Sequence, residues 1–159
     1  MITWTEVLRC TVGGAPVAKQ RPRTVRIGRG PRTRTYTPKK TLEYENRVAV
    51  AVQLSRRWRR TDGVPLLPSG TPVRVDIVAV FPRPKARHRK ADPVGLLPKA
   101  SRPDLDNVVK AAIDGCDGAH HLWHDDGQVQ CIRAEAWYAE VEGHPRTEII
   151  VYAPEGWET

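Results

Sequence analysis

Two aspartates and a lysine stand close together in the segment Arg102–Lys110, which reads RPDLDNVVK. Asp104 and Asp106 are two residues apart, and on extended backbone this spacing places both side chains on one face. Asp106 suits the N-cap of a following helix, and Lys110 would lie one turn further along the same face. The pattern predicts a pair of carboxylates with a cation beside it at the start of a helix. Alone, it is equally compatible with a helix cap followed by a surface charge ladder that continues to Asp114.

A second acidic pair, Asp125 and Asp126, comes just before an expected strand, where it could also be a simple turn with Gly127. Carboxylate oxygens are the ligands that suit Mg²⁺ or Mn²⁺. Such ions activate water for phosphodiester hydrolysis and neutralise the charge that develops on the phosphate. A nearby lysine can donate to a phosphate oxygen. Two acidic clusters in an otherwise basic chain therefore indicate metal-assisted hydrolysis.

The charge of the chain is divided along its length. The formal net charge is +8, but residues 1–60 hold 15 Lys and Arg against 3 Asp and Glu, whereas residues 101–159 hold 4 against 12. The first part thus carries +12 and the last part −8. This division predicts that one part attracts a polyanion while the other holds metal ions against it.

Hydrophobic patterning predicts the order strand, helix, strand, helix, strand, strand. The expected strands cover residues 6–12, 73–81, 128–142 and 148–153, and the last two form a hairpin around the turn at 143–146. The first helix begins with Thr37 as N-cap and Pro38 at its first position and runs to about Arg57, and its apolar face includes Leu42 and Leu54. The second helix covers about Asp106–Cys116.

These elements make residues 1–159 one small α+β domain with a mixed sheet of about four strands and two main helices. Residues 16–35 form a basic arm and residues 83–102 a long loop, and both are expected to be mobile. No apolar run is long enough to span a membrane and no leader segment is evident, so we expect a soluble, cytoplasmic protein with three reduced cysteines.

The motifs together resemble the RusA family of Holliday junction resolvases. The segment RPDLDNVVKAAID, the later WHDDGQV, and the earlier GGAPVAKQRPR and YTPKKTLEYE occur in the family's order and span most of the chain. The chain departs from the family at Gly115-Cys116, where Ala-Leu is more usual, and at His120-His121.

The resemblance implies a homodimeric, Mg²⁺-dependent endodeoxyribonuclease that resolves four-way junctions by paired nicks, in DNA recombination and repair, encoded by a bacterium or a phage. Mn²⁺ is expected to substitute. The family's catalytic and metal-binding acids fall on Asp104, Asp106 and Asp126 and its catalytic lysine on Lys110, with Asp125 a weaker candidate. The alternatives are a noncatalytic protein that binds branched DNA and a broader nuclease for flaps or forks.

Backbone phosphate contacts are expected from the basic arm and the start of the first helix, and the candidate DNA-binding residues are Lys19, Arg21, Arg23, Lys39 and Lys40. The tryptophans are interpreted as core or interface residues, with Trp123 the best candidate for base stacking because it adjoins the acidic pair. A zinc site among the cysteines and histidines of residues 116–131 is disfavoured, because their spacing is not that of a finger or knuckle.

Overall fold

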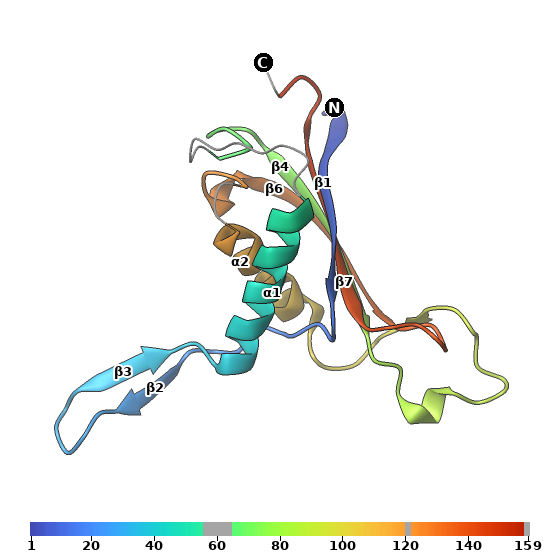
Figure 1. The fold of residues 1–159 in the computed structure, drawn as a ribbon, viewed down its shortest axis with the longest axis horizontal. Helices are drawn as coiled ribbons and strands as arrows, with labels where there is room; N and C mark the ends of the chain where they lie inside the picture. The colour runs from blue at the N-terminus through green and yellow to red at the C-terminus, as the bar shows by residue number, and fades with distance from the viewer. Residues whose placement is uncertain (56–64, 120–121, 158–159) are drawn as a thin grey trace.

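The main sheet of the chain has five strands and carries two helices on one of its faces, and a separate two-stranded hairpin projects from it (Figure 1). The structure is a computed structural model that describes residues 1–55, 65–119 and 122–157. The elements are β1 (Trp4–Gly13), β2 (Arg23–Arg26), β3 (Thr33–Tyr36), α1 (Lys39–Ser55), β4 (Val73–Phe81), η1 (Lys85–Arg87), β5 (Leu97–Pro98), α2 (Leu105–Gly118), η2 (Asp126–Gln128), β6 (Val129–Tyr138) and β7 (Arg146–Pro154). The expected small α+β domain with a mixed sheet is confirmed.

The strand order β1-β7-β4-β6-β5 corrects one prediction, since the last two long strands do not form a hairpin. β7 pairs antiparallel with both β1 and β4, and β4 separates it from β6. The reason lies in β4, where no residue is exposed. A strand buried on both faces needs a neighbour on each side, and β6 and β7 supply them. The short segment between β6 and β7 therefore passes the end of β4, where the Ala139 amide donates to the Phe81 carbonyl at 2.8 Å.

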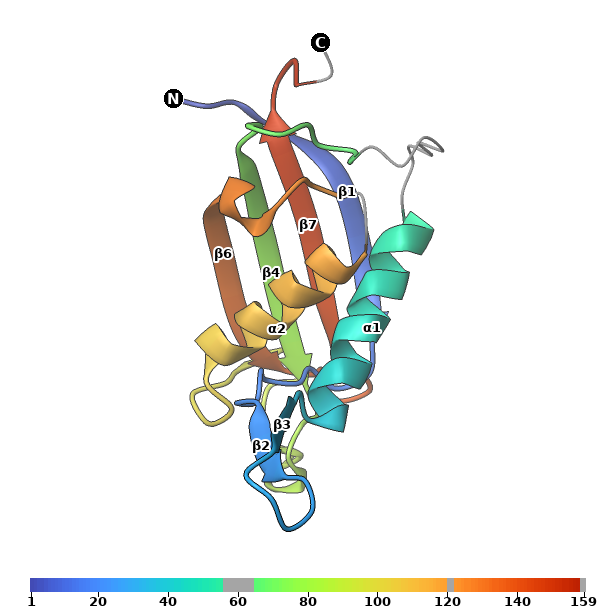
Figure 2. The ribbon, with the colours of Figure 1, turned by 90° about the vertical axis from the view of Figure 1, so that its left-hand side faces the viewer.

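β4 and β6 run parallel, so residues 82–128 must return the chain from one end of the sheet to the other. α2 lies within this crossover (Figure 2). The segment before α2 meets the carboxyl end of β6, where the Lys99 amide donates to the Ala136 carbonyl at 3.1 Å. The segment after α2 lies before the amino ends of the strands, where the Leu122 carbonyl accepts from the Leu67 amide at 2.9 Å. The two ends of α2 thus lie at opposite ends of the sheet.

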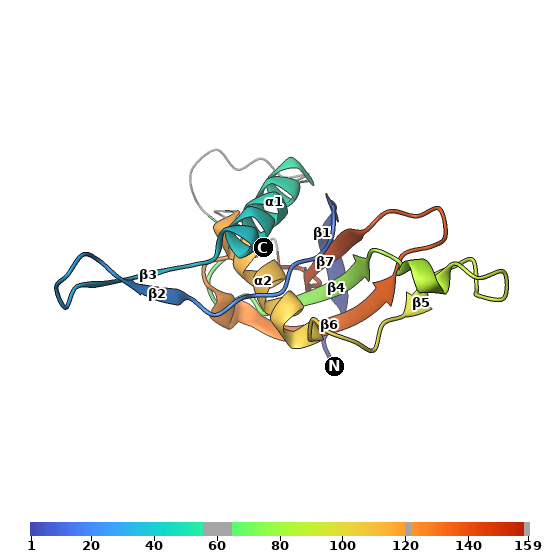
Figure 3. The ribbon, with the colours of Figure 1, turned by 90° about the horizontal axis from the view of Figure 1, so that it is seen from below.

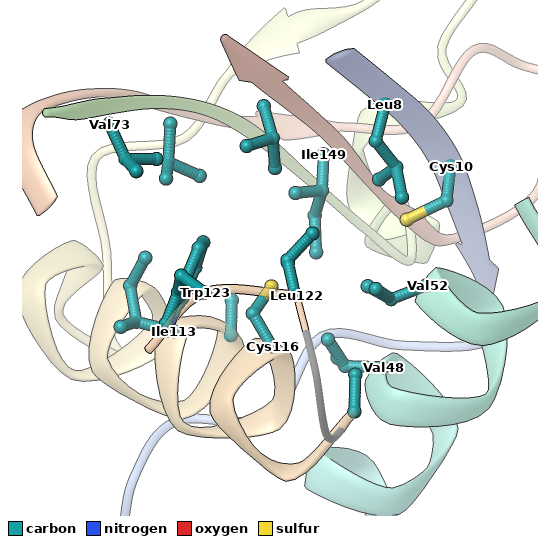
Figure 4. Packing of buried hydrophobic residues seen from close by; sticks show 14 of the residues in the cluster. Leu8, Cys10, Val48, Val52, Val73, Ile113, Cys116, Leu122, Trp123 and Ile149 are labelled. Carbon is teal, nitrogen blue, oxygen red and sulfur yellow. The ribbon is translucent and has the colours of Figure 1, made fainter. Parts of the chain in front are cut away.

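The core fills the space between the helices and the sheet (Figure 4). Val48 and Val52 of α1 and Cys116 of α2 face Ile149 of β7 and Cys10 of β1. All three cysteines are unpaired, and burial raises the pKa of the Cys10 thiol to about 11 and that of Cys116 further still. These two thiols therefore act as small hydrophobic side chains.

The helix boundaries differ slightly from the predictions. α1 begins at Lys39, and the Pro38 carbonyl accepts its first bond, from the Leu42 amide at 3.2 Å, so the cap lies one residue later than expected. Leu42 and Leu54 were expected on the core face but are 48% and 81% exposed. They lie beside the stripe of Tyr44, Val48 and Val52, which helical spacing turns toward the sheet. The expected helix end at Arg57 lies outside the described residues.

Within the basic arm, residues 23–36 form the β2–β3 hairpin. Its strands consist mainly of Arg and Thr and lack the apolar alternation by which a strand is normally predicted. The loop at 83–102 likewise contains η1 and the two-residue strand β5, and Arg83 Nη2 donates to the carbonyls of Pro93 and Gly95 at 2.7 and 3.1 Å. Both segments therefore hold regular structure that the sequence patterns did not predict.

Gly115 is the contact point of the two helices. A Cβ added there would lie 2.5 Å from Val48 Cβ and 3.0 Å from the Glu45 carbonyl oxygen, whereas one added at Gly118 would meet only Ala49 Cβ at 3.9 Å. We expect Gly115→Ala to lower the free energy of unfolding by about 1–3 kcal/mol, and Gly118→Ala to leave it unchanged or raise it. Urea unfolding of the two variants measures this, and equal effects would contradict the close packing.

Candidate functional site

Asp104 and Asp106 lie at the N-terminus of α2, at the carboxyl end of the parallel strands. The N-cap is Asp104, with extended backbone (φ −68°, ψ 138°), and Asp106 falls in the first turn. The prediction that Asp106 is the N-cap is therefore wrong, because the N-cap lies two residues earlier, at Asp104. The Asp104 side chain makes no capping hydrogen bond, and both side chains are exposed. The positive end of the helix dipole offsets part of the repulsion between these two negative charges.

Lys110 lies one turn after Asp106 and is exposed, and it forms no ion pair with any residue in the described parts of the chain. Asp114, one turn further, is instead bound to Lys19, whose Nζ lies 2.7 Å from its Oδ2. Asp106, Lys110 and Asp114 therefore do not form the surface charge ladder that the alternative interpretation expected along α2. Lys110 remains available to an anionic ligand beside the two carboxylates.

Lys99 is a positioning residue that the sequence patterns did not single out. Its ammonium donates to the carbonyl oxygens of Ser101 and of Pro103, the latter at 3.3 Å, and lies 4.4 Å from the centre of the Phe81 ring. These contacts hold the segment that leads to Asp104 against the end of β4. A hollow of about 450 Å³, lined by residues 99–105 and Ala136, opens beside this segment. In the sequence, the one sign of this role is that Lys99 stands four residues before Pro103-Asp104.

Asp125 and Asp126 differ in what they do. Asp125 caps η2, since its Oδ1 accepts from the Gly127 amide at 2.7 Å while Gln128 Oε1 accepts from the Asp125 amide at 3.2 Å. Gln128 is buried, and its Nε2 donates to the Pro68 and Thr71 carbonyls at 2.8 and 3.0 Å. Asp126 is exposed and takes no part in this network. This difference supports the preference for Asp126 over Asp125 as a candidate ligand.

Within one chain the structure does not bring Asp126 to the other two acids. Asp126 opens η2, the short helix that leads into β6 at Val129, whereas Asp104 lines the hollow beside Ala136, seven residues along β6 from Val129. At about 3.3 Å per residue the two ends are roughly 23 Å apart. Accordingly, no group of three or more metal-ligating side chains is found among the described residues.

Asp117 marks the opposite end of α2 from Asp104. Burial raises the pKa of Asp117, a hydrogen bond from the Trp123 indole Nε1 opposes that shift, and the neighbouring charges of Asp126 and Asp114 raise the pKa further. The electrostatic influence of Asp126 therefore falls at the C-terminal end of the helix. Trp123 itself is 5% exposed and packs in the core, which leaves no face on which a base could stack.

Among the candidate DNA-binding residues, Lys19 turns toward the protein body. Its Nζ lies 2.5 Å from Glu45 Oε1 and 2.7 Å from Asp114 Oδ2, and its amide donates to the Asn107 carbonyl at 2.8 Å. Burial disfavours the charged form, but the hydrogen bonds to Asp114 and Glu45 outweigh it and raise the pKa of Lys19. Lys19 thus joins the base of the arm to α1 and to the first turn of α2.

The other candidates, Arg21, Arg23, Lys39 and Lys40, are exposed. Of these, Lys39 forms an ion pair at 3.5 Å with Glu43, one turn further along α1. Both side chains are exposed to solvent, so this ion pair is weak and leaves Lys39 able to bind another anion. Arg21 and Arg23 lie at the start of the hairpin arm. The two histidines at 120–121, considered for a zinc site, lie outside the described residues.

The exposed carboxylates of Asp104 and Asp106, the exposed Lys110 and the basic arm that joins the same helix turn are the features expected of a protein class that hydrolyses nucleic acid with the help of a metal ion. Comparison with known protein families names the family within this class. Residues 13–152 match the family described as "Endodeoxyribonuclease RusA". The chain belongs to the RusA family of endodeoxyribonucleases, as the motifs predicted.

A relative from Bacillus subtilis (strain 168), "Uncharacterized protein YqaN", is 29% identical over 153 residues, which cover 92% of this chain and 96% of the relative. The similarity therefore extends over nearly the whole chain. In the described parts of the structure, no helix is long and apolar enough to cross a membrane.

The position of Lys19 leads to a prediction about stability. Lys19→Met removes the ammonium that touches both Glu45 and Asp114 and leaves two carboxylates facing each other. We expect the free energy of unfolding to fall by about 1–2 kcal/mol, whereas the matched variant Arg21→Met should change it by less than about 0.5 kcal/mol. Urea unfolding at low salt measures both. Equal stability of the two variants would mean that Lys19 does not anchor the arm.

Proposed function

We propose that the chain is a Mg²⁺-dependent endodeoxyribonuclease that resolves four-way DNA junctions by paired symmetric nicks, in DNA recombination and repair. The observation that supports this best is the start of α2, where Asp104 and Asp106 are exposed and unused by the fold and Lys110 follows one turn later. Family membership supplies the class of reaction. The basic arm beside this site supplies attraction for DNA.

The donor set fits a magnesium ion. Mg²⁺ is commonly held by one or two carboxylates together with substrate phosphate and water, and does not need a cage made only of protein ligands. When bound, it supplies an activated water and neutralises charge on the phosphate. Asp104 and Asp106 would hold the ion, and Lys110 would donate to a phosphate oxygen of the same strand. Mn²⁺ has the same preference for oxygen ligands and should substitute.

Asp126 can join this site only from a second copy of the chain. Asp126 lies in η2, before the start of β6, and that start is roughly 23 Å along the strand from Ala136 beside the Asp104 hollow. A two-fold homodimer places each protomer's residues opposite those of its partner. We therefore propose that Asp126 of one protomer completes the Asp104–Asp106 pair of the other. The dimer then also supplies two sites for the two strands of a symmetric junction.

Asp106→Asn should reduce cleavage of a four-way junction by about 100-fold or more, because it removes a metal ligand. Asp126→Asn should do the same. The matched control is Asp125→Asn, which removes the same charge one residue away while asparagine still caps η2, and it should stay within about threefold of the parent rate. Nicking of labelled junctions with Mg²⁺ measures all three, and gel shift in EDTA checks that DNA binding persists.

The same assay separates the rival functions when junction, flap, fork and linear duplex are compared. Tight binding of junctions with no cutting in Mg²⁺ or Mn²⁺ would show a noncatalytic branched-DNA-binding protein. Equal rates on flaps, forks and junctions would show a broader structure-specific nuclease. Full activity of Asp126→Asn would show that Asp126 is not part of the site.

A mixed dimer tests the shared site directly. Co-expressed Asp106→Asn and Asp126→Asn chains with different tags form heterodimers in which, under the shared arrangement, one site carries both substitutions and the other carries neither. We expect the purified heterodimer to regain nicking of one junction strand, although neither parent homodimer cuts. If each site were built from a single chain, both sites of the heterodimer would be damaged, and the mixture would remain inactive.

A further inference from the structure

We infer that one face of the β2–β3 hairpin is a binding surface for double-helical DNA beyond the cutting site. This inference rests on the proposed function only in that the chain acts on DNA. The hairpin forms its own two-stranded sheet and projects away from the main sheet (Figure 3). Every residue of both strands is exposed. An isolated two-stranded hairpin is at best marginally stable in water, so a ligand that covers it would also stabilise it.

The register divides the hairpin into two unlike faces, because directly paired residues point to the same side. The pairs Arg23–Tyr36 and Val25–Arg34 share one side, and the pairs Thr24–Thr35 and Arg26–Thr33 share the other. The alternation continues past the strands, where the Ile27 amide donates to the Arg32 carbonyl at 2.8 Å. We call the first side the arginine–apolar face, and it consists of Arg23, Val25, Ile27, Arg32, Arg34 and Tyr36.

The apolar residues of this face have no core to join. Val25, Ile27 and Tyr36 are 43%, 51% and 40% exposed, and they alternate with arginines on a projecting arm. On the opposite face the hydroxyls of Thr24 and Thr35 bond to each other at 2.9 Å. Exposed apolar side chains gathered on one side of a charged ribbon indicate a surface that is covered by a partner.

The charge of the arm indicates that this partner is a nucleic acid. Residues 21–36 contain six arginines and no Asp or Glu. None of these arginines forms an ion pair within the described parts of the chain. Arginines of this kind bind phosphates, and a two-stranded ribbon fits a groove of double-helical DNA, where Val and Ile can contact base edges and sugars.

The base of the arm sets where this duplex lies relative to the cutting site. The Lys19 amide bonds to the carbonyl of Asn107, the neighbour of Asp106, so the arm leaves the body beside the first turn of α2. From Arg23 to the tip at Gly28 the hairpin extends roughly 17 Å, which equals the rise of about five base pairs. The arm would therefore bind the duplex adjoining the cut over about half a helical turn.

Footprinting in EDTA tests the inference without relying on cleavage. The probe is a synthetic four-way junction, and the shortened variant replaces residues 24–35 by Gly-Gly between the paired Arg23 and Tyr36. We expect hydroxyl-radical protection on the bound arms to shrink by about five base pairs, with unchanged circular dichroism, because the hairpin contributes nothing to the core. Protection of unchanged length would overturn the inference.

Point variants test the choice of face. Val25→Ser combined with Ile27→Ser keeps the charge and should weaken junction binding about tenfold, with the salt dependence unchanged. Arg34→Gln should lower the salt slope by about one, whereas the matched Arg26→Gln on the threonine face should leave it unchanged. Equal slopes for these two arginine variants would contradict the assigned face.

The oligomeric state provides the last control. Sedimentation of the shortened variant should give the same mass as the parent chain. A dimer that dissociates when the arm is shortened, with a footprint that keeps its length at high protein concentration, would assign the hairpin to a second copy of the chain and overturn the DNA role. If the parent chain never cuts junctions but the shortened variant still loses about five base pairs of footprint, this inference stands and the proposed function is rejected.

Discussion

The parallel pairing of β4 with β6 is the constraint on which the rest of the structure depends. Parallel neighbours require the chain to cross back over the sheet, and α2 makes that crossing. Whatever precedes α2 must lie at the carboxyl ends of the strands, and whatever follows it must lie at the amino end of β6. The acids at 104 and 106 and the acid at 126 are therefore separated by the length of a strand, although only about twenty residues lie between them in the chain.

The packing of α1 on α2 gives this crossover its rigidity and links it to the arm. Gly115 allows the helices to approach until Val48 fills the space that a side chain would occupy. Next to this close contact, Lys19 bridges Glu45 of α1 and Asp114 of α2, and its backbone amide bonds to the Asn107 carbonyl. The base of the basic arm and the first turn of the acidic helix are thus one unit. Under the proposed function, a polyanion bound by the arm would lie beside the carboxylates of Asp104 and Asp106.

The fold also assigns different tasks to the six aspartates of residues 101–159. Three of these aspartates are used by the structure: Asp114 pairs with Lys19, Asp117 accepts from Trp123, and Asp125 caps η2. Three others have exposed carboxylates that the described structure does not use, namely Asp104, Asp106 and Asp126. This division agrees with the residues chosen from the motifs, and it gives a physical reason for that choice, since a carboxylate already committed to the fold is a poor metal ligand.

The sequence by itself determined the class of fold, the main helices and strands, and the candidate acids, because periodicity, capping residues and local motifs depend on short stretches of chain. β4 was predicted to the residue, since its apolar run ends at a proline. Only the tertiary structure decided the strand order, the hairpin within the basic arm, and the inward turn of Lys19. It also decided that Asp126 lies at the far end of the sheet, because that distance depends on which strands are neighbours, and pairing between distant segments leaves no mark in local spacing.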